Sequence, residues 1–236
     1  MKLKILFLSL LFSSIGYLQP KNPDLILENV KKEFDKIEDY KVDVKIKVDV
    51  DFLKMSDRKA TIYYKKPNKF HIDSDNFALL PKSGLNSSPL GFLDYKYNAY
   101  YMREDTVNGR ITSVIRVIPL EGDADVILTT LWVDTARNLI LKVESTRKPQ
   151  GTFYIEMDYQ KTNKGFWLPS SMKFSFTVER GLFPGRSNKE KNTIDTSKAE
   201  DRTVEPRTGY VYLKYSNYEV NIGLSDSIFE EKDENK

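Results

Sequence analysis

Residues 41–52, KVDVKIKVDVDF, alternate between charged and apolar side chains without interruption. Because successive side chains of a β-strand point to opposite faces, the pattern predicts a half-buried antiparallel strand. At ~3.3 Å per residue this strand would be about 40 Å long, roughly twice the usual length. Its charged face would meet solvent, and its apolar face would carry Val44, Ile46, Val48, Val50 and Phe52. A fold that contains this strand has to cover, or use, a long apolar wall.

Shorter segments with the same alternation follow along the chain. They extend the predicted apolar wall with Ile62, Tyr64, Phe70, Ile72, Tyr95, Tyr97 and Trp132. Asn108-Gly109 separates two of these segments and is a strong hairpin signal. Short strands that recur about every dozen residues, with turn residues between them, are typical of an antiparallel meander. The sequence therefore predicts a mainly β fold that closes toward a barrel or a sandwich.

One helix is predicted, over residues 21–40. Asn22 suits the N-cap position and Pro23 the first helical position. An apolar stripe at spacings of three or four residues consists of Ile26, Val30, Phe34 and Ile37. A helix of about 17 residues, ~25 Å long, cannot cover a sheet of about ten long strands. Either the sheet closes on itself around a filled core, or part of its apolar face stays open for a ligand.

Residues 75–93 break the β pattern with prolines, glycines and serines, and yet they are rich in large apolar side chains. These side chains are Phe77, Leu79, Leu80, Leu85, Leu90 and Phe92. Two interpretations stay open for this segment. It plugs one end of the core, or it forms a movable lid over an apolar cavity.

The two ends of the chain and one internal segment differ in composition from the predicted strands. Residues 1–16 combine two lysines, an apolar run and small residues, which is typical of a secretory signal peptide. Residues 17–236 would form a single domain with a charged tail at 231–236. Residues 181–208 are polar and charged, and they predict a long mobile loop or a partner-binding segment. No cysteine follows the apolar run to carry a lipid anchor, so we expect an exported, soluble protein.

The composition excludes several classes of function. The chain has no cysteine, which excludes disulfides, thiol catalysis and cysteine–zinc sites. The one histidine, His71, has the outward parity of its strand and is expected at the surface. The net charge of +3 arises from interspersed charges of both signs, which does not favour nucleic-acid binding. The chain contains no phosphate-binding glycine loop and no nucleophile elbow. We expect no catalytic residue and no cofactor.

Carboxylate groups are the remaining candidates for chemistry. Asp43, Asp49 and Asp51 alternate with lysines on the charged face of the first strand, so they are interpreted as cross-strand partners at the surface. An acidic cluster at Glu121, Asp123 and Asp125 could ligate calcium, but it lacks the EF-hand spacing and closing glutamate. A simple turn explains the cluster equally well. The sequence therefore predicts no metal site.

Three stretches resemble one superfamily. YYKKPNKFHI at 63–72 is similar to a strand–turn–strand of the periplasmic lipoprotein carrier LolA. Residues 107–145 resemble paired strands that end in a Leu-Trp-Val-Asp turn, and residues 215–229 resemble the closing tyrosine-rich strand. The superfamily also holds the outer-membrane lipoprotein acceptor LolB and the stress regulator RseB. Together the resemblance covers most of the chain after the signal peptide.

The resemblance implies a strongly curved, half-open antiparallel barrel with an N-terminal helix and a short lid. It implies a monomeric periplasmic carrier that takes lipid or lipoprotein acyl chains from an inner-membrane donor to an outer-membrane acceptor. The apolar wall would bind the acyl chains. Lys66 stands where the carrier uses an arginine to hold its lid closed, so it is the candidate for lid gating, without the fork of donors that arginine offers. The alternative is an envelope sensor or protein-binding scaffold of the same fold, as in RseB.

Overall fold

The computed structural model describes residues 21–50, 56–74, 90–93, 96–120, 126–148, 151–178 and 207–230. These residues form a ten-stranded antiparallel sheet in the order β3-β2-β1-β10-β9-β8-β7-β6-β5-β4. The strands are β1 (Asp39–Asp49), β2 (Arg58–Lys65), β3 (Lys69–Asp73), β4 (Tyr97–Val107), β5 (Arg110–Pro119), β6 (Val126–Asp134), β7 (Leu139–Arg147), β8 (Gly151–Lys161), β9 (Trp167–Val178) and β10 (Arg207–Val220). The helical elements are α1 (Pro23–Phe34), η1 (Gly91–Leu93) and η2 (Asp226–Ile228).

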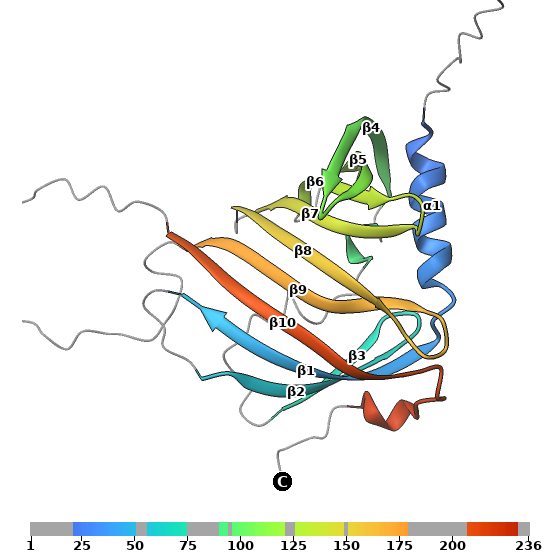
Figure 1. The fold of residues 1–236 in the computed structure, drawn as a ribbon, viewed down its shortest axis with the longest axis vertical. Coiled ribbons are helices and arrows are strands. Elements are labelled where there is room, and N and C mark those ends of the chain that lie inside the picture. The colour runs from blue at the N-terminus through green and yellow to red at the C-terminus, as the bar shows by residue number, and fades with distance from the viewer. Residues whose placement is uncertain are drawn as a thin grey trace, which may run out of the picture.

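The sheet is curved and open. Its strands wrap around a common interior, and α1 lies along one end of the strands (Figure 1). The two edge strands, β3 and β4, do not pair with each other. The prediction of a mainly β fold with one helix is confirmed for the described residues, and a half-open barrel agrees with this arrangement.

The strand predicted from the opening alternation is β1. Val42, Val44 and Ile46 are buried, while Lys45 and Lys47 between and beyond them are exposed. The strand covers eleven residues and pairs with β10 on one side and β2 on the other. An alternating pattern therefore specified both the strand and which of its faces is buried.

The helix begins as predicted and ends earlier. The Asn22 side chain accepts hydrogen bonds from the backbone of Asp24 and Leu25, and Pro23 is the first helical residue. We expected the helix to reach residue 40, but α1 ends at Phe34. The backbone from Asp39 onward pairs with β2 instead. Ladder hydrogen bonds and burial in the sheet override the local helical pattern over these residues.

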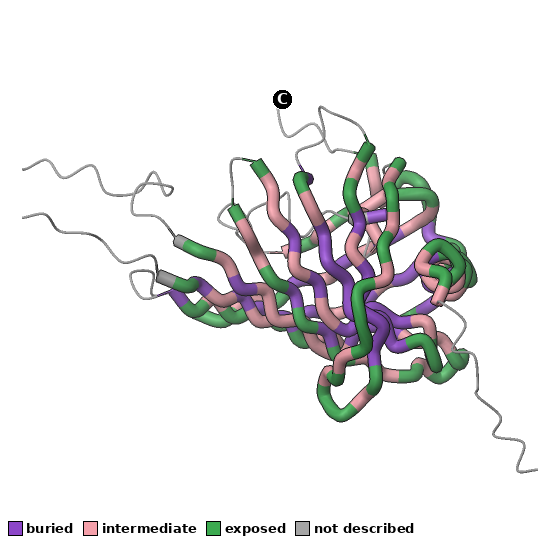
Figure 2. Tube along the Cα trace, turned by 90° about the horizontal axis from the view of Figure 1, so that it is seen from above, coloured by how far each residue is buried: buried purple, intermediate pink, exposed green. Residues whose placement is uncertain are grey.

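The buried side chains form two clusters on the inner face of the sheet. The first cluster lies on β1, β2 and β10, with one residue before β1 and one from β9, and comprises Ile37, Tyr40, Val42, Val44, Ile46, Ala60, Ile62, Tyr64, Leu168, Val211, Leu213 and Val220. The second cluster joins α1 to β5–β8 and comprises Leu27, Val30, Leu93, Ile115, Val117, Leu131, Val133, Ile140, Val143, Ile155 and Met157. Met172 and Phe174 pack against both clusters. Buried residues gather in the middle of the strands and beside α1, and many of the strand ends are exposed (Figure 2).

Candidate functional site

The inner face of the first three strands carries most of the predicted wall. Val44, Ile46, Ile62 and Tyr64 are buried there, and Val50 is buried just beyond the end of β1. A second group is only partly buried against the first cluster, and it comprises Val48, Phe70 and Ile72. Tyr97 is also partly buried, but it packs against the second cluster. The structure thus brings most of the predicted wall to one face of one sheet, which curves around a common interior.

The inner face continues across strands that the predicted wall did not include. Phe153 of β8 lies 5.2 Å from Phe174 of β9, and Phe174 lies 5.3 Å from Phe176, between ring centroids. All three rings are only partly buried. The same period-two alternation in GTFYIEMDY and MKFSFTV could have identified them. These rings extend the apolar wall over the middle of the sheet.

A cavity of about 590 Å³ lies where α1, the β2–β3 turn and η1 meet. Its described lining consists of Lys31, Phe34, Asp35, Tyr64, Lys66, Pro67, Leu90 and Leu93. The volume falls within the range of roughly 300–1,000 Å³ that ligand pockets occupy. The lining combines apolar side chains with two lysines and one aspartate, so the cavity suits an apolar ligand and has a polar border.

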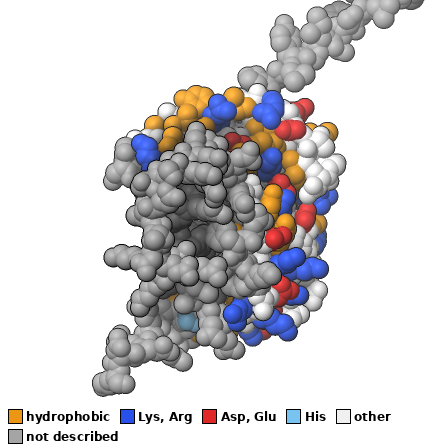
Figure 3. Space-filling model, turned by 90° about the vertical axis from the view of Figure 1, so that its left-hand side faces the viewer, with side chains coloured by type: hydrophobic (Ala, Val, Ile, Leu, Met, Phe, Trp, Pro, Cys, Tyr) orange, Lys and Arg blue, Asp and Glu red, His pale blue; other side chains and the backbone are white. Residues whose placement is uncertain are grey.

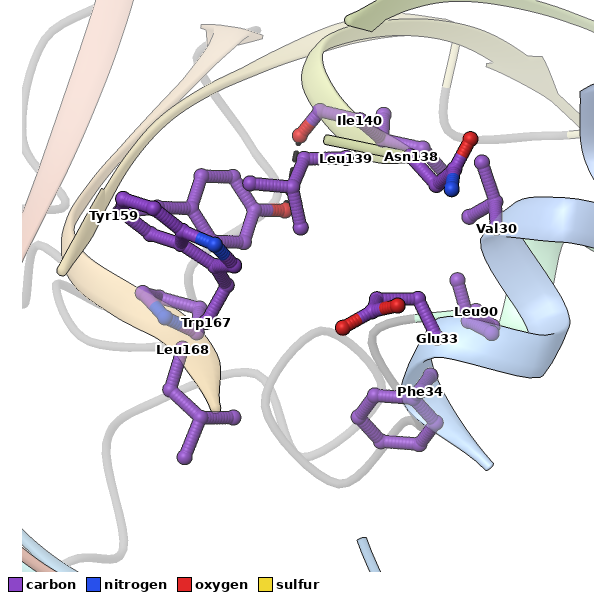
Figure 4. A pocket seen from close by; sticks show the side chains of 11 residues that line it. Val30, Glu33, Phe34, Leu90, Asn138, Leu139, Ile140, Tyr159, Trp167 and Leu168 are labelled. Atoms are coloured by element: carbon purple, nitrogen blue, oxygen red, sulfur yellow. Dashed lines mark hydrogen bonds between the residues drawn. The ribbon is translucent and has the colours of Figure 1, made fainter. Parts of the chain in front are cut away.

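A smaller cavity of about 40 Å³ lies between α1 and the starts of β7 and β9. Figure 4 shows the Glu33 carboxylate and the Tyr159 ring on opposite sides of it. The Tyr159 hydroxyl donates a hydrogen bond to the Ile140 carbonyl oxygen at 2.8 Å. This volume has room for water and is far too small for an acyl chain. The larger cavity is therefore the candidate binding site.

Comparisons with known proteins agree in fold. No family profile matches this chain, and no curated protein matches it in sequence. A solved domain assigned to an outer membrane lipoprotein-sorting protein from Vibrio parahaemolyticus is 13% identical with a TM-score of 0.58, over 88% of this chain and 97% of that chain. A LolA superfamily protein from Nitrosomonas europaea is 12% identical with a TM-score of 0.55, over 90% of this chain and 99% of that chain. A DUF1329 family protein from Desulfovibrio piger is 13% identical with a TM-score of 0.56, over 89% and 98% of the two chains.

This chain has the fold of the LolA superfamily. The resemblance predicted from residues 63–72, 107–145 and 215–229 is confirmed at the level of the fold. Because each match covers nearly all of both chains, the LolA-like fold accounts for the helix and the sheet together.

Among the described residues of the predicted wall, Trp132 does not lie on the inner face of the sheet. Its neighbours Leu131 and Val133 both belong to the second cluster, so Trp132 points to the outer face. There the indole donates a hydrogen bond to the Asp105 carboxylate at 3.0 Å, and the Lys142 ammonium lies 4.6 Å from the indole ring. The indole hydrogen bond, followed by one from the Thr106 backbone, lowers the pKa of Asp105. Leu131 occupies the inward position that we had expected Trp132 to fill.

Lys66 bonds to the end of α1. Its ammonium donates to the Asp35 carbonyl oxygen and to the Glu38 carboxylate, the latter at 3.1 Å. A cation suits this place because carbonyl groups at a helix C-terminus carry partial negative charge. The described end of the predicted lid is η1, which is held by Lys31 through a 2.9 Å hydrogen bond to the Leu93 carbonyl oxygen. Sequence reasoning missed Lys31, and gating by Lys66 stays a prediction.

Several predicted positions fall outside the described residues. In the wall these are Phe52 and Tyr95, and in the lid they are Phe77, Leu79, Leu80 and Leu85. Phe92 lies within η1, although its side chain is not described, and Leu90 is partly buried beside both cavities. The signal peptide, the 121–125 turn, nearly all of the 181–208 segment and the 231–236 tail also lie outside the described ranges.

Four tyrosines lie in or beside the buried clusters: Tyr40, Tyr215 and Tyr218 at the first cluster, and Tyr159 at the second. Burial is the largest cause that raises the pKa of Tyr40, Tyr159, Tyr215 and Tyr218 above the usual value of 10. The Tyr218 hydroxyl donates to the Pro169 carbonyl oxygen at 2.9 Å. Neutral tyrosines whose hydroxyls hydrogen-bond to backbone present a ring and no charge to the interior.

The outer face is charged, as predicted. Lys45 pairs with Asp57 at 2.7 Å, and Lys41 pairs with Glu219 at 3.1 Å. Asp43 accepts a hydrogen bond from the Asn217 side chain at 2.9 Å, and His71 is exposed on β3. Figure 3 shows basic and acidic side chains mixed along one flank of the molecule.

The described residues contain neither a cluster of metal ligands nor a membrane-spanning helix. In that part of the chain no three His, Asp or Glu side chains stand close enough together to hold a metal ion. The same ranges contain no helix with the length and apolar character needed to cross a membrane.

Proposed function

We propose that this protein binds an acyl chain of a lipid or of a lipid-modified protein between the inner face of the sheet, α1 and η1, and carries it through the periplasm toward the outer membrane. The single observation that carries the proposal is the 590 Å³ cavity at the end of a long apolar wall. The solved domain assigned to lipoprotein sorting supports the proposal through its shared fold.

The partly exposed rings on the inner face support binding of an apolar chain. Phe70, Phe174 and Phe176 each keep part of their surface uncovered beside the buried clusters. Covering apolar surface gains about 25 cal/mol per Å², so an acyl chain that lies on these rings would bind without any new polar contact. Such binding is non-covalent and requires neither a catalytic group nor a cofactor. Release to an acceptor then needs no chemical step.

Transport further requires a donor at the inner membrane and an acceptor at the outer membrane, and a monomeric carrier that moves between them. Lys31 and Lys66 border the cavity and both bond to backbone carbonyl groups. Breaking these two contacts would widen the cavity beside η1. We therefore place ligand entry on this side of the molecule.

The test is a search for bound lipid followed by a displacement assay. Protein purified without detergent is extracted with organic solvent, and the extract is analysed by mass spectrometry. The delipidated protein is then titrated with a fluorescent fatty acid. We expect co-purified lipid and saturable binding.

A matched pair of variants assigns the binding to the cavity. Leu90→Trp places a large ring at a residue that lines the cavity, and it should weaken binding of the probe. Ile222→Trp adds the same ring at a position with 44% exposure, outside the cavity lining, and it should bind as the wild type does. Absence of lipid together with absence of saturable binding would refute the proposed function.

A further inference from the structure

Arg147 is a cation on the inner face of the sheet. It is the last residue of β7, where it has the same parity as Val143 of the second cluster and Ser145, which is fully buried. Its guanidinium carbon lies 5.6 Å from the centroid of the Phe153 ring. The apolar wall therefore ends, at this edge, in a positive charge.

Within the described ranges, no acidic side chain pairs with this guanidinium. Its Nε atom is buried and has no hydrogen-bond partner. None of the ion pairs found among the described residues includes Arg147. A buried polar group without a partner costs free energy, and a guanidinium offers a planar fork of donors that matches a carboxylate or a phosphate. Arg147 is thus equipped to bind an anion that the described part of the chain does not supply.

Arg147 and the region beside α1 lie at opposite ends of one strand. Ile140 lines the small cavity next to α1. Arg147 lies seven residues further along β7, which corresponds to roughly 23 Å at ~3.3 Å per residue. From Phe153 beside Arg147, the partly buried rings of Phe174 and Phe176 continue the apolar surface toward the first cluster, where the inner face is less covered. A long-chain amphiphile can therefore lie along the wall with its polar end at Arg147.

We propose that Arg147 binds the anionic group of the ligand, so that the ligand is an acyl or alkyl chain that ends in a carboxylate or a phosphate. The inference rests on the proposed function and narrows its ligand class. An uncharged acyl ester would offer the guanidinium only a neutral acceptor, which forms a weaker hydrogen bond than a carboxylate or a phosphate. A free anion without a chain would leave the wall uncovered.

The experiment measures displacement of an uncharged dye, N-phenyl-1-naphthylamine, from the delipidated full-length protein. The competitors share one chain length: dodecanoate, methyl dodecanoate and dodecyl phosphate. The wild type should bind at least one of the two anions roughly tenfold more tightly than the ester, as a charged hydrogen bond contributes. The carboxylate and phosphate arms identify which anionic group is preferred.

Two glutamine variants test whether Arg147 causes the preference for anionic competitors over the ester. Arg147→Gln should bind all three competitors with similar affinity. Arg116→Gln is the matched control, because the Arg116 Nε is also buried without a partner while its neighbours Ile115 and Val117 place it on the outer face. It should keep the wild-type preference. If Arg147→Gln does not fold, Arg147→Lys retains the charge without the fork and should show a reduced preference.

The outcomes separate the inference from the proposed function. If anions and ester displace the dye from the wild type equally well, the anion site is refuted and acyl-chain binding stands. If the preference survives in Arg147→Gln, another group binds the anion and the inference is wrong. If none of the three competitors displaces the dye, both the proposed function and the inference fail.

Discussion

The inner face of the sheet has two halves, and α1 covers one of them more completely than the other. On β5–β8, α1 completes the second cluster, where Leu27 and Val30 are 0% and 3% exposed. On β1–β3 and β10, α1 adds Phe34, which is itself only partly buried. Beside it Val48, Phe70 and Ile72 also keep exposed surface. The half on β5–β8 is packed as a core, and we call it the packed half. The half on β1–β3 and β10 retains apolar area that a ligand can cover, and we call it the open half.

This difference has a physical cost. Apolar surface that stays in contact with water forgoes about 25 cal/mol per Å² of stabilisation. The cavity of about 590 Å³ borders the less covered half through Phe34 and Tyr64. A fold that only needed stability would fill this space, so the comparison of the two halves favours a binding role for the first one.

The largest expected effect comes from removing a side chain of the packed half. Leu27→Ala leaves a cavity at a fully buried position and should lower the free energy of unfolding by about 3 kcal/mol. Ile72→Ala, at a partly buried position of the open half, should lower it by about 1 kcal/mol because the site is already partly solvated. Urea denaturation measures both. Equal losses would show that the two halves are packed alike.

The next effect concerns hydrogen bonds in the open half that join the start of β1 to the segment after β10. Asp39 is 4% exposed, and its carboxylate accepts hydrogen bonds from the backbone of Ile222, Gly223 and Leu224 at 2.8–3.1 Å. Asp39→Asn replaces one acceptor by a donor that faces these donors. It should lower the free energy of unfolding by about 2 kcal/mol.

Asp49→Asn is the control for this substitution. Asp49 is exposed on the outer face of the same strand, so its replacement should change stability by less than about 0.5 kcal/mol. The same urea denaturation compares both variants with the wild type. If both changed stability equally, the buried hydrogen bonds of Asp39 would not be what closes this end of the sheet.

A third effect separates binding from stability. Phe176→Ala removes a partly buried ring of the inner face and should weaken acyl-chain binding about fivefold, which corresponds to about 1 kcal/mol of lost apolar contact. Tyr154→Ala is the control, because Tyr154 is 38% exposed and points outward from the neighbouring strand. Dye displacement by dodecanoate measures both. Weakening by Tyr154→Ala alone would place the ligand on the outer face.

Side-chain parity predicted the sheet well because it depends on a local rule. Val44, Ile46, Ile62 and Tyr64 all lie on the inner face that alternation assigned to them. The assignment of Trp132 differs from its observed place. The continuous run TLWVD in β6 is buried on both faces, and the sequence does not show which face is the inner one. Pairing of Leu131 with Ile115 decides it.

The site was harder to predict than the sheet. The cavity depends on how α1, the β2–β3 turn and η1 meet, and none of these relations is local in sequence. Lys31 holds η1 through the Leu93 carbonyl oxygen, 62 residues away, and looks like an ordinary helical lysine in the sequence. Arg147 is in phase with the apolar positions of β7, but only the folded sheet shows that its Nε atom is buried and unpaired among the described residues, beside the Phe153 ring.

The smallest effect concerns η2 at the outer edge of the open half. Asp226 pairs with Lys65 at 2.8 Å and with Lys69 at 3.1 Å, and the hydrogen bond from Lys65, followed by that from Lys69, lowers the pKa of Asp226 below 3.8. Because the pKa is lower in the folded state, the ion pairs contribute stability above pH 3.8 and lose it as the pH falls through the lowered pKa. The groups are exposed, so salt screens them and the change in stability is small.

A carboxyl NMR titration measures this effect directly. In the wild type the midpoint of Asp226 should lie below 3.8, and Lys65→Met should move it upward. Lys161→Met replaces an exposed lysine on β8 and should leave the midpoint unchanged. An unshifted midpoint in Lys65→Met would mean that η2 is not held to β2 by charge. An upward shift confined to Lys65→Met would show that the open half is held at this edge by exposed ion pairs, in contrast to the apolar packing of α1 against the other half.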